Sequence, residues 1–318
     1  MYKSVYVWPN PAFPFRVFYE SEKVRIFIIE NLQHNYDWIE HYHKYFKPTD
    51  YFFVILGSHW SKYLLDNAID MFDHLGLNLG NFYILYNDER DKQLFSSAGF
   101  QGDVINQNCW LDYNKDMCVL PNTEKEYKAI YIGRMIPVKR HYLAKSVDRL
   151  ALVAGMLYGN NKEVDAPKHI YRNESPLTPK EVAQKINQSS CGLILSEKEG
   201  ACFASSEYLL CGIPVVSTKS EGGRDFWYDE YNSIVCTDDE YEVARAVEYF
   251  YSNPRDPQVI RGNHISKANF LRAKFVLKIS EIFEKHGVFE DNGIEYFNAN
   301  YFHKMRVSHK PNFEEIFK

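Results

Sequence analysis

The chain has 318 residues, of which 45% are hydrophobic and 25% are charged, and its formal net charge is −5. This length predicts two domains that can each bury a core, and the composition is ordinary for a globular protein. The negative charge argues against a general nucleic-acid binder, because affinity for a phosphate backbone needs a surplus of Lys and Arg.

The first 120 residues alternate between apolar runs and amphipathic helical patterns. Near-continuous apolar runs predict strands buried on both faces at residues 24–30, 51–57 and 82–87. Helical patterns lie at residues 37–46, 61–74 and 89–98, and we expect a further strand over residues 103–108.

A polar break at residues 121–126 precedes a new apolar run that begins at Ala129. We therefore expect an N-terminal domain over residues 1–123, a C-terminal domain over 124–290 and a tail over 291–318. In the second domain, strands are expected at residues 129–133, 150–156 and 191–196, and helices at 141–148, from Pro179, at 238–251 and at 257–286. This alternation predicts an α/β fold with two Rossmann-like domains.

The segment 191–225 places Glu199 and Glu207 on either side of a predicted strand-to-helix junction. We expect a helix over residues 201–210, with Glu207 about two turns inside it. Backbone N–H groups at Ala201, Cys202 and Phe203 then have no intrahelical partner, and such groups favour an anion, commonly phosphate. A carboxylate in the loop, another in the helix and free N–H groups between them suit a sugar, a ribose and a phosphate linker.

A second candidate element follows another predicted strand, at Gly133, Arg134 and Lys139. Arg134 offers planar, multidentate donors and Lys139 a mobile point charge, which together suit two adjacent phosphates. Parallel sheets bind ligands at the carboxyl ends of their strands, so both elements can converge on one ligand. Solvated surface charges are the alternative interpretation of either element by itself.

Taken in order along the chain, these elements resemble the retaining glycosyltransferases of group 1, which have the GT-B fold and carry a Glu-x7-Glu motif. The resemblance covers residues 125–285 well and the first 120 residues poorly. It implies two Rossmann-like domains that face a cleft, with the C-terminal tail crossing back to the first domain. It also implies a pocket for the donor built from Gly133, Arg134, Lys139, Gly200, Ala201, Cys202, Phe203 and Glu207.

The resemblance implies distinct roles for the charged residues. Glu199 would lie beside the donor sugar, Glu207 would hold the ribose hydroxyls, and Arg134 and Lys139 would bind the diphosphate. Cys202 departs from the family pattern, because a small glycine is usual there and lets the backbone approach phosphate.

The first domain contains fewer residues that indicate a function. His59 follows a strong apolar run, and the family often places a first-domain histidine near the donor sugar; a core or capping histidine is an equal alternative. No glycine precedes Gly57, although family members commonly carry a glycine-rich loop after the first strand. The proline-rich segment 8–14 cannot be helix interior, which leaves an extended N-terminal arm or an acceptor-side loop.

The sequence contains no Asp-x-Asp pair of the kind that holds a divalent ion in many glycosyltransferases. The nearest acidic cluster, Asp238 and Asp239, precedes a predicted helix, and we interpret it as an N-cap. We therefore expect no metal site and no cofactor beyond the donor, a UDP- or GDP-linked sugar. The expected reaction is a metal-independent, retaining transfer to a glycan, lipid-linked or other glycoconjugate acceptor. The alternatives are an inactive nucleotide-sugar-binding subunit, a sugar-nucleotide epimerase and a glycan phosphorylase.

Cysteine usage and hydropathy bear on the compartment. The six cysteines include no Cys-x2-Cys pair and no histidine at metal-binding spacing, so we expect reduced, mostly buried thiols. No signal-peptide pattern and no run of 18 apolar residues occurs, which predicts a cytoplasmic protein. The segment 301–310 is basic, but two glutamates among the last 18 residues favour a solvated tail over a peripheral membrane contact, which stays open.

Overall fold

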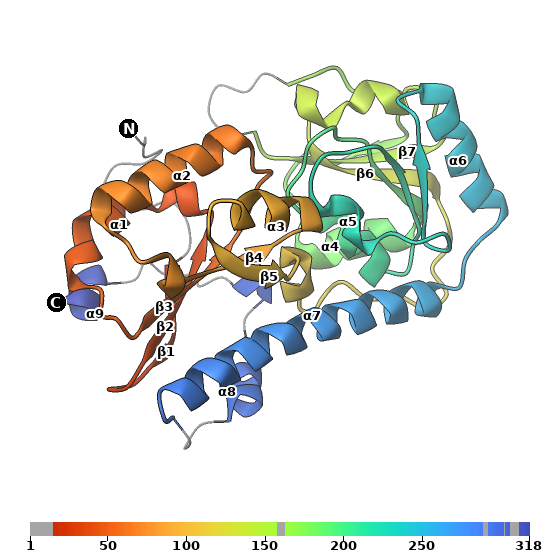
Figure 1. Ribbon diagram of the computed structural model, residues 1–318. Coiled ribbons are helices and arrows are strands. Elements are labelled where there is room, and N and C mark those ends of the chain that lie inside the picture. The colour runs from red at the N-terminus through yellow and green to blue at the C-terminus, as the bar shows by residue number, and fades with distance from the viewer. Residues whose placement is uncertain (1–14, 158–162, 289–291, 302, 306–311) are drawn as a thin grey trace. The chain divides into compact units, whose positions relative to one another are not determined.

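The computed structural model describes residues 15–157, 163–288, 292–301, 303–305 and 312–318 (Figure 1). The proline-rich segment 8–14 and most of the basic segment 301–310 lie outside these ranges. The contacts within the chain divide it into two compact units: unit 1 comprises Met1–Trp110 and Asn269–Lys318, and unit 2 comprises Leu111–Ala268.

This division differs from the boundaries expected after residues 123 and 290. Residues after Trp110 join unit 2 because Asn187 holds them: its side chain accepts from Leu120 N at 2.8 Å and donates to Cys118 O at 2.9 Å. At the other boundary, helix α7 (Pro257–Lys285) is one continuous helix that contributes to both units (Figure 1). Its second half belongs to unit 1, where Phe275 packs edge-on against Phe53.

Unit 1 is built on a five-stranded sheet in the order β1-β2-β3-β4-β5. The strands are β1 (Phe15–Glu20), β2 (Arg25–Glu30), β3 (Asp50–Ile55), β4 (Phe82–Tyr86) and β5 (Gln101–Val104). The pairs from β2 to β5 are parallel, and β1 is antiparallel to β2. The predicted strands at 24–30, 51–57 and 82–87 are confirmed, whereas the antiparallel edge strand was not foreseen.

The strand expected over residues 103–108 is wrong in its position. β5 ends at Val104, and residues Gln107–Trp110 form a 3-10 turn. Side-chain amides replace the strand ladder here: Asn106 Nδ2 donates to Asn87 O at 2.9 Å, and Asn87 Oδ1 accepts from Gln107 N at 3.0 Å.

Five helices accompany the sheet of unit 1 in the described residues, beside the second half of α7. They are α1 (Tyr36–Tyr42), α2 (Lys62–Leu75), α3 (Glu89–Ser96), α8 (Gly293–Asn300) and α9 (Phe313–Phe317). The helix expected over residues 37–46 is shorter than predicted, because a 3-10 turn over His43–Tyr45 follows α1.

Unit 2 contains a six-stranded parallel sheet in the order β11-β10-β9-β6-β7-β8. The strands are β6 (Tyr127–Arg134), β7 (Leu150–Gly155), β8 (Tyr171–Arg172), β9 (Ser189–Ile194), β10 (Val215–Thr218) and β11 (Ser233–Cys236). The chain runs outward from β6 to β8, then returns to β9 on the other side of β6 and continues to β11. The carboxyl ends of β6 and β9 therefore form a topological switch point, where open α/β sheets bind ligands.

The remaining helices of unit 2 are α4 (Pro179–Asn187), α5 (Phe203–Leu210), α6 (Glu240–Ser252) and the first half of α7. Thr178 and Glu181 form a capping box at the start of α4. Asp239 caps α6, since its carboxylate accepts from Tyr241 N and Glu242 N, both at 2.9 Å. The predicted N-cap is thereby confirmed.

The helix expected over residues 141–148 is wrong. Only a 3-10 turn forms, over His141–Ala144, because the backbone bonds here join residues three apart, as from Val147 N to Ala144 O at 3.1 Å. The core of unit 2 forms between this sheet and α6, where Val243, Val247 and Phe250 are buried.

Four of the six cysteines are buried, at positions 109, 191, 211 and 236. Within the described ranges, none of the helices is both long enough and apolar enough to span a bilayer.

Candidate functional site

Both predicted motifs leave the sheet of unit 2 at the switch point. β6 ends at Arg134 and the 3-10 turn Pro137–Lys139 follows, while Glu199 lies in the loop between β9 and α5. These strands are direct neighbours, with Tyr131 paired with Leu193. The structure joins the motifs through Lys139, whose Nζ donates to Glu199 Oε1 in an ion pair.

The surroundings of Lys139 keep its ammonium charged. Its side chain is 15% exposed and that of Glu199 is 16% exposed. Burial lowers the pKa of Lys139, but the nearby Cys202 and Glu199 raise it by more, so the pKa lies above its ordinary value. The charge of Arg134 opposes this rise, which means that the two cations are close enough to repel each other.

Two glycines lie beside the side chains of these cations. A Cβ atom at Gly133 would lie 3.8 Å from Lys139 Cδ, so the lysine stem lies over the strand end. A Cβ atom at Gly155, on neighbouring β7, would lie 3.4 Å from Arg134 Cγ. Arg134 itself is partly exposed at the end of β6.

The loop that carries Glu199 is bound to the loop after β10. Glu199 N donates to Glu221 O at 3.0 Å, and Glu221 N donates to Glu197 O at 2.9 Å. Gly222 follows with a φ of 115°, and a Cβ atom there would lie 1.7 Å from the carbonyl oxygen of Glu199. Only glycine fits this contact, which gives Gly222 a physical role in placing Glu199.

Helix α5 begins at Phe203 rather than at Ala201, because Cys202 adopts a left-handed conformation with a φ of 54°. This is the backbone region that favours glycine. Burial, and then the charge of Glu199, raise the pKa of the Cys202 thiol to about 11, so the thiol is neutral at physiological pH.

Glu207 lies about one turn inside α5, not two, and is partly exposed. Gly200 and Ala201 are buried just before the helix. The structure thus gathers the residues of the predicted donor pocket within unit 2, around the amino end of α5 and the end of β6.

Two buried tyrosines that the sequence analysis did not select hold the backbone of this site. Tyr131 donates its hydroxyl hydrogen to Lys139 O. Tyr208 accepts from Ile132 N at 2.8 Å, and its ring covers Gly192, where a Cβ atom would lie 2.1 Å from the ring. In the sequence, both tyrosines sit in apolar runs and give no sign of this role.

His59 lies in unit 1, after β3, and is partly exposed. The Arg90 guanidinium lies 2.9 Å from His59 Nδ1, and it also donates to Trp60 O at 3.1 Å. An arginine therefore orients this histidine, and its proposed place near the donor sugar stays a prediction.

The missing glycine-rich loop of unit 1 has a replacement. After β2, Asn31 takes the left-handed conformation with a φ of 58°, which asparagine tolerates better than most residues. A Cβ atom at Gly57 would lie 2.2 Å from the Asn31 side chain, so the ends of β2 and β3 pack closely. In the sequence, this left-handed turn is indicated by an asparagine directly after an apolar run.

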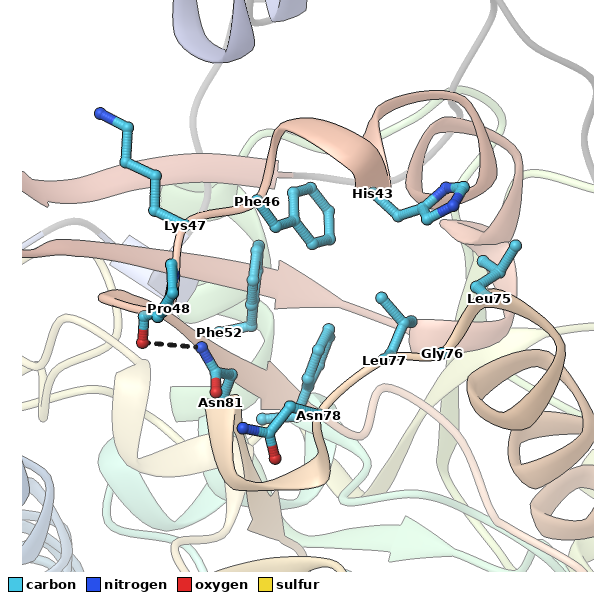
Figure 2. A pocket seen from close by; sticks show the side chains of 11 residues that line it. His43, Phe46, Lys47, Pro48, Phe52, Leu75, Gly76, Leu77, Asn78 and Asn81 are labelled. Atoms are coloured by element: carbon cyan, nitrogen blue, oxygen red, sulfur yellow. Dashed lines mark hydrogen bonds between the residues drawn. The ribbon is translucent and has the colours of Figure 1, made fainter.

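A pocket of about 240 Å³ lies elsewhere in unit 1, at the amino ends of β3 and β4 (Figure 2). Phe46, Phe52 and Phe82 line it, with Lys47 at its edge. Asn81 Nδ2 is already bonded to Pro48 O at 3.2 Å. Because parallel sheets bind ligands at the opposite, carboxyl ends of their strands, we assign this pocket no role.

The residues described contain no group of three or more His, Cys, Asp or Glu side chains that could hold a metal ion.

No family model and no curated protein matches the sequence. Solved structures are similar in fold. One, described as trehalose-6-phosphate from E. coli bound with UDP-2-fluoro glucose, has a TM-score of 0.60 at 14% identity over 82% of this chain and 74% of that chain. Sucrose-phosphate synthase from Thermosynechococcus elongatus has a TM-score of 0.57 at 11% identity, over 82% and 73% of the two chains. HepE from Anabaena in complex with UDP has a TM-score of 0.50 at 16% identity, over 73% and 72%. The chain has the GT-B fold.

Proposed function

We propose that this protein is a retaining glycosyltransferase, which transfers a sugar from a nucleoside-diphosphate donor to a glycan, lipid-linked or other glycoconjugate acceptor without a metal ion. The observation that carries the proposal is the partly buried Lys139–Glu199 ion pair at the switch point of unit 2. Arg134 and the amino end of α5 flank this pair. Two cations, a carboxylate and the amino end of a helix suit the phosphates and sugar of such a donor.

The similar structures support this proposal by what they bind. One was solved with UDP-2-fluoro glucose and one with UDP. A further one, with a TM-score of 0.58 at 13% identity over 83% of this chain and 74% of that chain, concerns glycosyltransfer with retention by trehalose-6-phosphate synthase.

In the proposed reaction, negative charge grows on the diphosphate as the glycosidic bond breaks. Lys139 and Arg134 stabilise that charge, and the raised pKa of Lys139 keeps its ammonium cationic at neutral pH. The departing phosphate assists deprotonation of the acceptor. Glu199 orients the donor sugar and Glu207 holds the ribose hydroxyls.

The ion pair adds a step to donor binding. Lys139 donates to Glu199, so a diphosphate that binds at Lys139 would share this ammonium. Sharing would loosen Glu199 from Lys139 as the sugar enters, which couples phosphate binding to the placement of the carboxylate.

A panel of UDP- and GDP-linked sugars tests the proposal. We expect one of them to raise the melting temperature and to be hydrolysed slowly without acceptor, with both effects reduced in Lys139→Ala. Lys145→Ala is the matched control, because Lys145 is a lysine of the same unit with its side chain 61% exposed. Binding without hydrolysis or transfer would favour the inactive subunit, and neither binding nor hydrolysis across the panel would overturn the proposal.

A further inference from the structure

Arg224 is an arginine without solvent exposure that links the carboxyl ends of β9 and β10. Its Nη1 donates to Ile194 O at 3.3 Å and to Ser196 O at 2.8 Å, and its Nη2 donates to Thr218 O. Ile194 is the last residue of β9 and Thr218 the last of β10. Nε donates to the carboxylate of Asp225 at 2.7 Å.

Arg140 is a second buried arginine at the same strand ends, directly after Lys139 in the chain. Its Nε donates to Leu195 O at 2.6 Å and its Nη2 to Thr218 Oγ1 at 2.6 Å. Asp238 accepts from Nη1 at 2.7 Å. Three consecutive carbonyls, at 194, 195 and 196, are thus each held by a buried guanidinium.

This arrangement depends on the shape of the guanidinium. Arginine presents five N–H donors in a planar fork, whereas lysine presents three donors at one point. A lysine at position 224 would keep the positive charge but could not bridge two strand ends. The substitution Arg224→Lys therefore separates the effect of the positive charge from the effect of the bridge between the strand ends.

Arg224 is connected to both of the backbone segments that place Glu199. The held segment 194–196 leads directly into the loop that carries Glu199. The other loop, which accepts the Glu199 N–H through Glu221 O and contacts its carbonyl through Gly222, ends at Arg224 itself. Arg140 in turn fixes the end of the turn that carries Lys139.

We propose that Arg224 and Arg140 are positioning residues for the Lys139–Glu199 pair: Arg224 sets the backbone of Glu199, and Arg140 sets the backbone of Lys139. The catalytic part of this inference rests on the proposed function, whereas the placement of the two loops does not.

The test compares Arg224→Lys and Arg140→Lys with Arg245→Lys, a control on α6 whose side chain is 70% exposed. Two measurements are made on each protein: hydrogen exchange of peptides covering residues 195–202, and kcat and KM for hydrolysis of the sugar nucleotide that the wild-type protein accepts. For both arginine variants we expect faster exchange in these peptides and a loss of about tenfold in kcat, with KM changed by less than about threefold. The control should match wild type in both. For Arg140→Lys, peptides covering residues 136–141 are measured as well, and wild-type exchange there would overturn the role of Arg140 at Lys139.

Wild-type exchange and wild-type kcat in a folded Arg224→Lys protein would overturn the inference. If Arg224→Lys does not fold, Asp225→Asn decides, because it removes only the charged partner of Arg224 on a side chain 36% exposed; unchanged exchange over residues 195–202 would again overturn it. Faster exchange in a chain whose wild-type form hydrolyses no sugar nucleotide would sustain the placement of the loops and overturn the proposed function instead.

Discussion

The carboxyl ends of the parallel strands are tied together by different chemistry in the two units. In unit 1 the ties are neutral amides: Asn87 Nδ2 donates to Leu56 O at 2.5 Å, and Asn106 Nδ2 donates to Asn87 O at 2.9 Å. In unit 2 the ties are the guanidinium groups of Arg140 and Arg224. The same structural task is therefore done without charge in one unit and with two buried positive charges in the other.

This difference bears on what each edge can bind. Arg140 and Arg224 also bond carboxylates, those of Asp238 and Asp225, so Arg134 and Lys139 are the cations that an anion would meet at the end of β6. In unit 1 the amide ties carry no charge, and the cation beside them is Arg90, which contacts His59.

The largest effect is expected from the cations of unit 2. Arg134→Ala and Lys139→Ala should each lower turnover by roughly tenfold to a hundredfold beyond any loss of donor affinity, because a charge-assisted contact is worth about 1.5–3 kcal/mol. The double variant should lose less than the sum, since both side chains serve the same phosphates. Single-turnover rates and donor dissociation constants measure this.

Near-wild-type turnover of Arg134→Ala at saturating donor would remove that residue from the site. It would also contradict the contrast drawn between the two units, because the positive charge at the strand ends of unit 2 would then have no part in the reaction.

Removing one of the neutral amide ties of unit 1 should lower the stability of the protein and leave nucleotide affinity unchanged. Asn87 is fully buried, and Asn87→Ala deletes its bonds to Leu56 O and Gln107 N. We expect the free energy of unfolding to fall by about 1–3 kcal/mol, measured by urea denaturation, with nucleotide affinity unchanged. Gln93→Ala, on the exposed face of α3, is the control. A loss of nucleotide affinity in Asn87→Ala would contradict the division of roles between the units.

A smaller effect on nucleotide binding is expected from the carboxylates of Glu207 and Glu199, and it should differ between the two. Glu207→Ala should weaken binding of the free nucleotide by about fivefold, the value of one ordinary hydrogen bond of about 1 kcal/mol, and by more than Glu199→Ala does. Calorimetry with UDP and GDP measures both, with the exposed Glu230→Ala as control. Equal losses in the two variants would remove the ribose role from Glu207.

The smallest expected effect is that of a chelator. Activity should persist in excess chelator, because Arg134, Lys139 and the amino end of α5 serve the diphosphate. Complete loss that magnesium or manganese restores would show that charge at this edge is supplied by a metal as well.

The sequence predicted the alternation of strands and helices well, since apolar runs report burial directly. It also placed Lys139 and Glu199 after two predicted strands, because a motif at a strand end can be located once the strand is found; the structure shows that these strands are neighbours. The antiparallel β1 was missed, as its pairing depends on a neighbour and not on its own pattern. Arg140 and Arg224 were missed for a related reason: a buried arginine and a solvated one look the same in a sequence, and only the tertiary structure supplies the carbonyls.

Residues with a left-handed backbone conformation were likewise not predicted from the sequence. Asn31 and Cys202 both adopt positive φ values, which the pattern of apolar and polar residues does not report. The helix start at Phe203 and the depth of Glu207 in α5 shifted as a result.

The path of the chain through the two units has a consequence for biosynthesis. Unit 2 is one uninterrupted stretch, whereas unit 1 needs residues from Asn269 onward, which are translated after unit 2. Phe275, which packs on Phe18 and Phe53, and Phe317, which packs on Phe27, leave the ribosome only after unit 2. The strands of unit 1 that precede unit 2 in the chain are therefore covered only after unit 2 has been made, and their apolar faces stay exposed until then.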